Sequence, residues 1–331
     1  MERKLLGRTE LKVTPLGLGL AALGRPGYIN LKHSQDLGPQ KDVSSVEQHA
    51  HGVLDAAWEA GIRYFDVARS YGLAEAFLAS WLSGRRISPD EVTVGSKWGY
   101  VYTADWQVNA RVHEVKEHSL DVLRRQRRES DQNLGKYLGL YQIHSATLDS
   151  GVLENQEVLE QLSQYQQEGL VIGLTLSGPN QAVVLRRAME IAINGQLLFG
   201  CVEATWNLLE PSAGSTLQEA NRRGMGVIVK EALANGRLTE NNEDPSFASK
   251  LKALKQAADE QETTVDAIAL AAVLAQPWAD VVLSGATTRQ QVISNVAAAQ
   301  IIWSPTLAER FASMVETPER YWEKRSSLRW T

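Results

Sequence analysis

Four side chains that could together reduce a carbonyl group lie at or just beyond the ends of short apolar segments. Asp66, Lys97 and His144 each end such a segment, and Tyr71 follows Asp66 by five residues. Each has an ordinary structural alternative: a helix cap, a surface lysine with a packed stem, or a buried ring whose polar atom is hydrogen-bonded. Because all four follow the same pattern, we expect one shared site.

These residue types suit proton donation to the oxygen of a carbonyl group whose carbon receives a hydride. The reference pKa of tyrosine, about 10, is high for an acid near neutral pH. An ammonium about 4 Å away contributes roughly 4 kcal/mol at an effective dielectric of about 20, or about three pKa units. We therefore expect Tyr71 to be the general acid and Lys97 to lower its pKa. Asp66 would hold Lys97, and His144 would orient the carbonyl.

The elements that must position these residues follow a regular rhythm. Eight short apolar runs, typical of buried parallel strands, alternate with amphipathic stretches; they are 16–21, 63–66, 92–97, 138–144, 171–176, 200–206, 226–230 and 280–284. This rhythm predicts an α/β fold, a (β/α)₈ TIM barrel, in which the strand C-terminal ends share one face. A doubly wound open sheet is the alternative, but Gly17, Gly19 and Gly24 do not have the spacing of its glycine-rich turn.

The remaining segments are expected to complete a single domain of residues 1–331. The residues 4–13 predict an N-terminal hairpin that closes the bottom of the barrel. Gly61, Gly169 and Gly224 are expected to end helices. The polar stretches 24–45, 124–135 and 241–246 predict long loops. Three helices are predicted from apolar faces made of Val53, Leu54, Ala57 and Ala60, of Leu159, Leu162 and Tyr165, and of Val183, Leu185, Ala188 and Ile191.

Composition excludes several classes of protein. Lys+Arg number 34 against 39 Asp+Glu, a formal net charge of -5, which argues against nucleic acid as a partner. No apolar run approaches the ~18 residues of a membrane span. Residues 1–4 and 16–23 imitate a secretory signal, but charges, a proline and glycines interrupt it, so we expect a cytoplasmic protein. His49 and His51 lie in a helical stretch at i, i+2, and His113 and His118 are open to the same objection, so we expect no metal.

Three motifs together resemble the aldo-keto reductases. They are Phe65-Asp66-Val67-Ala68-Arg69-Ser70-Tyr71-Gly72, Gly95-Ser96-Lys97-Trp98-Gly99 and Leu140-Tyr141-Gln142-Ile143-His144. The resemblance extends from the N-terminal hairpin to about residue 298. It implies a (β/α)₈ barrel that binds extended NADP(H), with Asp66, Tyr71, Lys97 and His144 as the catalytic tetrad.

The resemblance also implies a cofactor site, which this sequence matches less completely. Thr175 stands where a Ser-Asn pair is usual, and Glu203 replaces a Gln; both are expected at the carboxamide, with Trp206 stacking on the nicotinamide. The segment 230–238, with Lys230, Gly236 and Arg237, resembles the pyrophosphate loop, and Ala21 is expected at the cofactor as well. At the adenosine end the resemblance implies a site made of Gly285, Thr287, Gln291 and Asn295.

The sequence favours NADP(H) over NAD(H) at that adenosine end. It opens the last helix of the barrel, where amides and the helix dipole attract an anion. Thr287 and Thr288 could donate to a 2′-phosphate and Arg289 could add positive charge, although Gly285 and Gln291 replace two members of the family's Lys–Ser–Arg clamp.

The expected substrate is a small carbonyl compound in an apolar pocket. Tyr28, Trp98 and Tyr100 are expected to line it, and a C-terminal tail with Trp322 and Trp330 is expected near its mouth. The alternatives are an NAD(P)-dependent sugar or alcohol dehydrogenase and a cofactor-sensing regulatory subunit of the same fold. We expect a monomer or a small homo-oligomer with neither membrane nor nucleic acid as partner.

Overall fold

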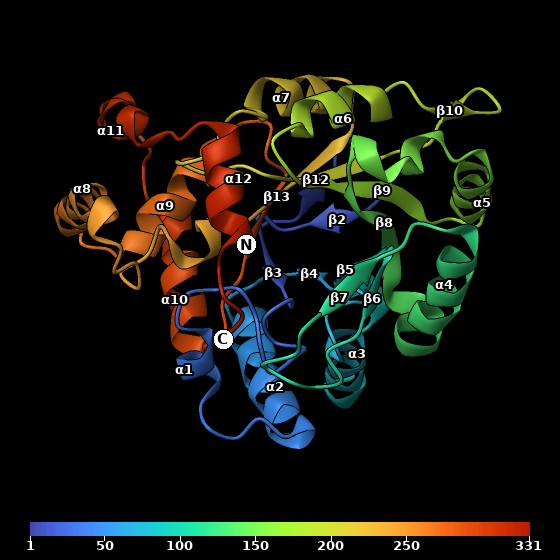
Figure 1. Cartoon of the computed structure of the whole chain (residues 1–331), viewed down its shortest axis with the longest axis horizontal. Helices are drawn as coiled ribbons and strands as arrows, with labels where there is room; N and C mark the ends of the chain where they lie inside the picture. Colours follow the sequence, from blue (N-terminus) through green and yellow to red (C-terminus); the bar gives the residue numbers. More distant parts are fainter.

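Eight parallel strands close into a barrel in the computed structural model, which describes residues 1–331 (Figure 1). Every predicted strand is part of it, so the (β/α)₈ barrel is confirmed and the open sheet is excluded. In order around the barrel, with the last strand pairing with the first, the strands are β3 (Leu16–Gly19), β4 (Tyr64–Asp66), β5 (Thr93–Trp98), β8 (Leu138–Ala146), β9 (Val171–Leu176), β12 (Cys201–Thr205), β13 (Gly226–Lys230) and β14 (Val281–Ser284).

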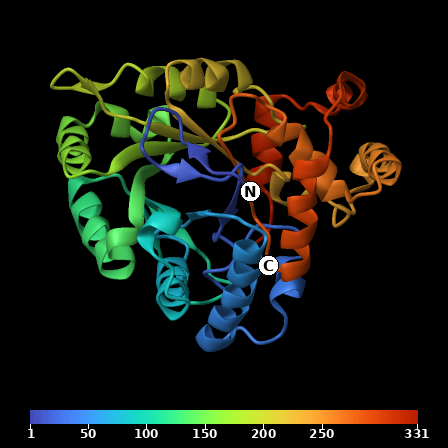
Figure 2. The same cartoon turned by 180° about the vertical axis from the view of Figure 1, so that it is seen from behind.

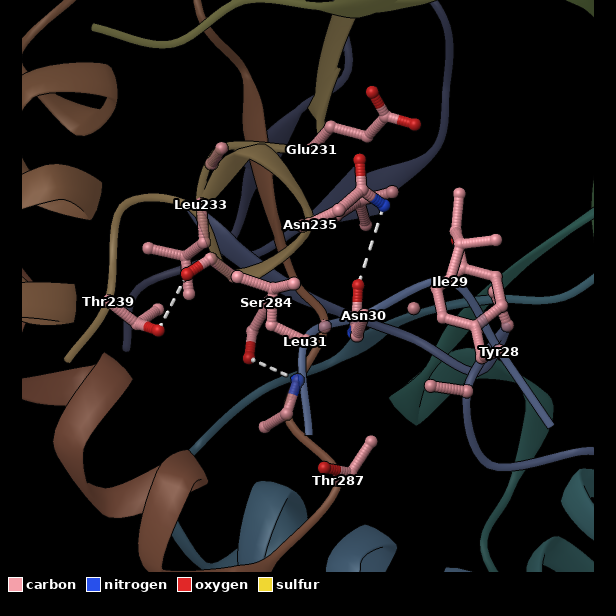
Figure 3. A pocket seen from close by; sticks show the side chains of 18 of the residues that line it. Tyr28, Ile29, Asn30, Leu31, Glu231, Leu233, Asn235, Thr239, Ser284 and Thr287 are labelled. Atoms are coloured by element: carbon pink, nitrogen blue, oxygen red, sulfur yellow. Dashed lines mark hydrogen bonds between the residues drawn. The ribbon is translucent and has the colours of Figure 1, made fainter. Parts of the chain in front are cut away.

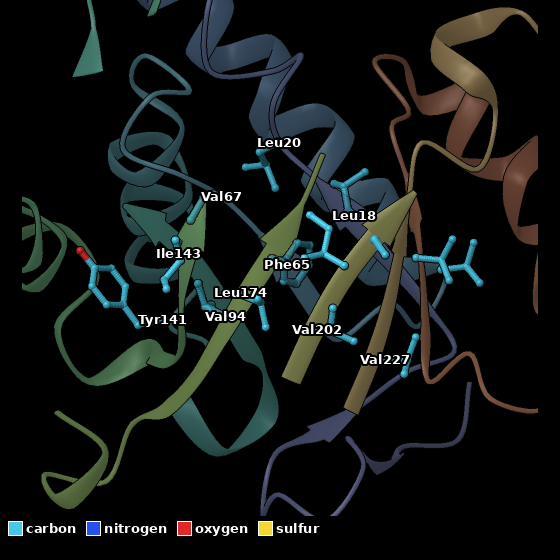
Figure 4. Packing of buried hydrophobic residues seen from close by; sticks show 14 of the residues in the cluster. Leu18, Leu20, Phe65, Val67, Val94, Tyr141, Ile143, Leu174, Val202 and Val227 are labelled. Carbon is cyan, nitrogen blue, oxygen red and sulfur yellow. The ribbon is translucent and has the colours of Figure 1, made fainter. Parts of the chain in front are cut away.

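Helices surround the barrel and contact its outer face. Successive strand residues face opposite sides, so β3 directs Leu18 outward, and Phe65, Ile143 and Val202 do the same on their strands within one large buried cluster (Figure 4). The helices are α1 (His33–Leu37), α2 (Val43–Glu59), α3 (Ala74–Gly84), α4 (Leu120–Leu134), α5 (Gln156–Gln167), α6 (Gln181–Ala188), α7 (Gly214–Arg222), α8 (Ala248–Glu260), α9 (Val265–Leu274), α10 (Arg289–Ala297), α11 (Pro305–Phe311) and α12 (Pro318–Ser326).

The predicted hairpin closes the N-terminal end of the barrel. Strands β1 (Lys4–Leu5) and β2 (Lys12–Val13) pair antiparallel, and Figure 2 shows them crossing this end. Leu6 is fully buried among inward-facing residues that include Tyr64 and Ile228. Gly226 leaves the necessary room, because a Cβ there would lie 2.5 Å from the Leu6 Cγ. Chemistry is therefore confined to the other end of the barrel.

Two local predictions were wrong. Residues 124–135 were expected to form a loop, yet 120–134 form α4. Its many charges lie on the solvent side, with ion pairs Arg125–Glu129 and Arg127–Asp131 one turn apart, while Leu123 and Leu134 are buried. Val183 was expected on the buried face of its helix, yet on α6 (Gln181–Ala188) it is exposed, and the neighbouring Val184 is buried instead.

The other predicted element ends are confirmed. Gly61, Gly169 and Gly224 follow α2, α5 and α7 with φ of 88°, 101° and 90°, which glycine adopts without strain. Residues 24–45 form a loop apart from α1 and the first turn of α2. Short pairs project from the barrel: β6 (Tyr100–Tyr102) with β7 (Glu114–Lys116), and β10 (Ala192–Ile193) with β11 (Gln196–Leu197).

The chain after β13 adds a second layer beside the barrel. Helices α8, α9, α11 and α12 share a separate buried cluster that contains Trp322, Phe311 and Leu254. Beyond α12 the tail crosses to the first long loop, where Thr331 N donates to Tyr28 O (3.0 Å) and Tyr28 N donates to Thr331 O (3.2 Å). The tail therefore lies over the mouth, as predicted. None of the helices combines the length and apolarity required to cross a membrane.

Candidate active site

The predicted catalytic residues meet at the C-terminal end of the barrel. Asp66 ends β4, Lys97 is the fifth residue of β5, and His144 lies near the end of β8. Tyr71 lies in the loop after β4, with its ring centroid 5.5 Å from that of His144 and 5.0 Å from Lys97 Nζ. Three strands and one loop thus bring a phenol, an imidazole and an ammonium together.

Lys97 is fully buried between two carboxylates. Its Nζ donates to an Asp66 carboxylate oxygen, forming an ion pair, and lies 3.5 Å from a Glu203 oxygen. It also donates to the Val67 carbonyl at 3.2 Å. Burial lowers the pKa of Lys97, but the charges of Asp66 and Glu203 more than offset this and leave it raised. Lys97 therefore stays an ammonium.

The second carboxylate changes the expected tuning of Tyr71. Burial raises the pKa of Tyr71 well above its usual value, and the negative charges of Asp66 and Glu203 raise it further, whereas Arg25 lowers it. The expected net lowering of this pKa is therefore not found, because burial and the charges of Asp66 and Glu203 outweigh the cations nearby. Tyr71 holds its proton at all physiological pH values, the state that a general acid requires.

His144 is neutral, and its ring is held in place by neighbouring side chains. Burial lowers its pKa well below the usual value, and the nearby charges of Lys97, Lys230 and Arg25 lower it further. The His144 Nδ1 lies 3.5 Å from the Ser70 hydroxyl oxygen, and the Tyr100 ring packs against the imidazole with centroids 4.9 Å apart. A neutral imidazole has one N–H, so it can donate a hydrogen bond to a carbonyl oxygen.

A cavity of about 800 Å³ extends from the tetrad to the start of α10. Figure 3 shows part of its wall, with labelled residues from three separate segments: Tyr28 to Leu31, Glu231 to Thr239, and Ser284 to Thr287. Most predicted cofactor and substrate residues line it, as do three of the tetrad: Ala21, Tyr28, Asp66, Tyr71, Tyr100, His144, Glu203, Lys230, Gly236, Gly285, Thr287, Gln291 and Asn295. Trp330 also lines it, whereas Trp322 is buried in the second cluster.

Two tryptophans predicted at the site face away from it. Trp98 follows Lys97 on β5, and since Lys97 points inward, Trp98 points outward; it is fully buried against His118, with centroids 5.6 Å apart. Trp206 lies three residues after the inward-facing Glu203 and packs against Trp278, with centroids 5.7 Å apart. Neither lines the cavity, so the substrate role of Trp98 and the nicotinamide-stacking role of Trp206 are both wrong.

Comparison with known proteins identifies the family. A sequence model described as Aldo/keto reductase family matches residues 15–315, nearly the whole chain. The chain belongs to this family. A solved structure titled aldo-keto reductase AKR11C1 from Bacillus halodurans (holo form) superposes with a TM-score of 0.72, covering 96% of this chain and 97% of that one, at 21% identity.

Two curated relatives of this aldo/keto reductase have assigned names. "Pyridoxal 4-dehydrogenase" of Microbacterium luteolum is 26% identical, with 89% of this chain and 92% of the relative covered. "NADH-specific methylglyoxal reductase" of Escherichia coli (strain K12) is 24% identical, with 97% of this chain and 100% of the relative covered. This aldo/keto reductase is therefore an oxidoreductase of a family that uses nicotinamide cofactors.

Two further residues predicted at the cofactor of this aldo/keto reductase, Thr175 and Arg237, do not line the cavity and make contacts within the protein. The Thr175 Oγ1 accepts the backbone N–H of Ser145 at 2.7 Å, and Thr175 does not line the cavity. Arg237 is buried and donates to Glu316 at 2.6 Å, outside the cavity.

Sequence reasoning missed several cavity residues that lie outside the barrel strands. Arg25 lies within 5.3 Å of the centroids of Tyr28, Tyr71 and Trp330, and its guanidinium donates to Glu114 at 3.0 Å. It follows Gly24 in a stretch without periodicity, so no sequence signal marks it. Other missed residues include Asp36, Ser177, Asn235 and Arg325.

Proposed function

We propose that this aldo/keto reductase reduces aldehydes or ketones to alcohols with a nicotinamide cofactor. The observation that carries the proposal is the meeting of Tyr71, Lys97, Asp66 and His144 at one end of a long cavity. The proposal includes an apolar substrate pocket lined by Tyr28 and Tyr100. It also includes a single-domain cytoplasmic enzyme that is a monomer or small homo-oligomer.

The cavity residues fit a dinucleotide. The volume of about 800 Å³ lies in the upper part of the range for small-molecule sites. Asn235 is 5% exposed and lines the cavity, and its Oδ1 has no hydrogen-bond partner. Gly236 beside it has φ +90° and leaves the backbone accessible. Lys230 and the loop 231–236 would hold the diphosphate, and Glu203 would accept from the carboxamide.

The chain's own residues supply everything except the hydride, which reduced nicotinamide supplies when bound. The N–H of neutral His144 would donate to the substrate carbonyl oxygen and orient it. Tyr71 would transfer its phenolic proton to that oxygen as negative charge develops there. Lys97 would stabilise the phenolate that remains, and Asp66 keeps the ammonium of Lys97 in place.

Replacing the phenolic hydroxyl tests this assignment. We expect Tyr71→Phe to lower kcat by about 10³-fold or more while the Kd for the cofactor changes less than about 3-fold, because the ring remains and only the proton donor is lost. The assay is loss of nicotinamide absorbance over a panel of aldehydes and ketones, with cofactor Kd measured by fluorescence titration. Tyr100→Phe is the matched control, since Tyr100 lines the same cavity and packs on the same imidazole. Equal turnover of Tyr71→Phe and wild type would refute the assignment.

The oxidative direction is a second candidate, favoured by a relative named pyridoxal 4-dehydrogenase. The same residues serve both directions, with Tyr71 returning as phenolate to accept the proton. Comparing kcat/KM for alcohol oxidation and carbonyl reduction on matched pairs decides between them.

A further inference from the structure

A carboxylate occupies the end of the cavity farthest from the tetrad. Asp36, on α1, lines the cavity there, and its Oδ2 accepts from Thr287 Oγ1 at 2.7 Å and from Gln291 Nε2 at 2.9 Å. We propose that Asp36 makes this chain select NAD(H) over NADP(H). The inference rests on the proposed function for the location of the cofactor, and it reverses the preference expected from the sequence.

The direction of the cavity decides which part of a dinucleotide meets Asp36. Proton transfer takes place at Tyr71 and His144, so the nicotinamide must lie at their end. The cavity then continues past Asn235 to Ser284 and Thr287 (Figure 3). The adenosine of an extended dinucleotide therefore reaches the start of α10, where the 2′-phosphate is the only difference between the two cofactors.

The cation expected to hold that phosphate points elsewhere. Arg289 does not line the cavity. Its guanidinium lies 3.5 Å from the Glu59 carboxylate on α2, and both side chains are exposed to solvent. Thr287, the expected hydroxyl donor, gives its hydrogen bond to Asp36. Thr287 and Arg289, two of the three residues on which the NADP(H) expectation depended, are therefore engaged elsewhere, and the third, Thr288, accepts the Gln291 N–H with its hydroxyl oxygen.

Three backbone amides at and just before the start of α10 are also engaged. Thr287 N donates to Gln291 Oε1 at 2.8 Å, and Gln291 N donates to Thr288 Oγ1 at 3.1 Å. Ala286 N donates to the Ser284 hydroxyl at 3.2 Å. A helix N-terminus attracts phosphate through free N–H groups, and side chains of the same segment already satisfy those of Thr287 and Gln291, which leaves the Arg289 and Gln290 amides at the first two helical positions.

The remaining charge around this end is negative. Glu240, Asp259 and Asp266 also line the cavity, with Lys255 as the cationic neighbour of Glu240. A carboxylate accepts hydrogen bonds from ribose hydroxyls, the role that an acidic residue has in NAD-binding sites of another fold. The same carboxylate repels the two negative charges of a 2′-phosphate. Asp36 therefore favours binding of NAD(H), which has a 2′-hydroxyl, and disfavours binding of NADP(H), which has a 2′-phosphate.

Equilibrium binding tests the inference independently of turnover. The Kd values of NADH and NADPH would be measured by isothermal titration calorimetry at about 50 mM and 500 mM salt. We expect NADH to bind at least about 10-fold more tightly at low salt. This ratio should shrink at high salt, because ions screen the repulsion between exposed charges.

Variants assign the effect to Asp36. We expect Asp36→Asn to reduce the NADH/NADPH preference to within about 3-fold, and Asp36→Asn with Gln291→Arg to favour NADPH, because the second change adds a phosphate partner. Glu47→Gln is the matched control; it removes a carboxylate on α2 that bonds to Ser80 and does not line the cavity, so the preference should stay unchanged.

Each result separates this inference from the proposed function. Equal or tighter binding of NADPH by the wild type, or an unchanged preference in Asp36→Asn, overturns the role of Asp36 while carbonyl reduction can still be measured. Tighter NADH binding without turnover of any carbonyl supports Asp36 and counts against the reductase. If neither cofactor binds, both proposals fail.

Discussion

At the scale of single residues, the pairing of Lys97 with two carboxylates determines how the site responds to pH. Burial raises the pKa of Asp66 to about 7, and the charge of Glu203 adds to this rise, while Lys97 opposes it. Below that pH Asp66 becomes protonated and holds Lys97 less firmly, leaving Glu203 as its remaining charged partner. Burial therefore places the acid side of the activity profile near the Asp66 pKa, and the charge of Glu203 moves it further up.

Removing that charge should move the acid limb of activity. In the wild type we expect kcat/KM for carbonyl reduction to fall as pH drops through about 7, because Asp66 takes up a proton. In Glu203→Gln the like charge is gone, so the pKa of Asp66 falls and the limb moves to lower pH by about one unit. Stopped-flow or steady-state rates between pH 5 and pH 9, roughly the stable range of most proteins, measure this shift.

The control for this prediction is another carboxylate of the same cavity. Glu240→Gln removes a carboxylate at the end of the cavity near Lys255, away from Asp66, so its acid limb should match that of the wild type. A limb that stays in place in Glu203→Gln would show that Glu203 does not influence Asp66.

At the scale of elements, the end of β8 is held in an irregular conformation that positions His144. The register between β8 and β9 shifts between Ile143 and Ala146, and Ser145 has a φ of 53°, in the left-handed region. Neighbouring elements fix this turn: Thr175 accepts the Ser145 N–H, and the Ser145 carbonyl accepts from Lys116 at 2.9 Å. The position of His144 therefore depends on contacts outside its own strand.

We expect Thr175→Val to damage both stability and catalysis. The change keeps the shape of the side chain but leaves the buried Ser145 N–H without an acceptor, which costs about 1–3 kcal/mol. It also releases the turn beside His144, so kcat should fall by about 10-fold with little change in cofactor Kd. Denaturant unfolding and steady-state kinetics measure the two effects.

Thr216→Val is the matched control for that change. Thr216 is equally buried, on α7, but its hydroxyl has no hydrogen-bond partner. Its replacement should leave both the unfolding free energy and kcat close to the wild-type values. If Thr175→Val behaved in the same way, the bond to Ser145 would have no part in holding His144.

The strands and helices differ in how well the sequence predicts them. The barrel strands were predicted because each is a short apolar run, and the tetrad followed from their ends. Helix α4 was missed because its charged residues hide the sparse inward pattern of Leu123, Gln126 and Ser130. Trp98 and Trp206 were expected to face the cavity, although the alternation of side chains along a strand places them on the opposite face from Lys97 and Glu203.

At the scale of the whole molecule, contacts between distant segments shape the cavity, and no local pattern predicts them. Asp36 meets Gln291 across 255 residues, and Arg237 meets Glu316 across 79. Such pairs depend on how loops pack after the barrel has formed. Their chemistry was therefore misassigned: Asp36 was not considered, and Arg237 was expected to bind diphosphate.

Arg237 and Glu316 instead join the segment 230–238 to the C-terminal layer as a buried ion pair. Arg237 also lies against the Tyr321 ring of α12, 5.4 Å from its centroid. Both charged side chains are nearly inaccessible, at 2% and 6%. Removing one partner from such a pair leaves an uncompensated buried charge, which costs about 3–5 kcal/mol, whereas replacing both with apolar residues is often neutral.

We therefore expect Glu316→Gln to lower the free energy of unfolding by about 3–5 kcal/mol, and the double change Arg237→Met with Glu316→Met to recover most of that loss. Denaturant titration measures both. Cofactor Kd should stay within about 3-fold of the wild type in the folded double variant, because neither side chain lines the cavity. A loss of affinity of about 10-fold or more in that variant would return Arg237 to the cofactor site. Full stability of Glu316→Gln would mean that Arg237 finds another partner and that the C-terminal layer is held by its apolar cluster alone.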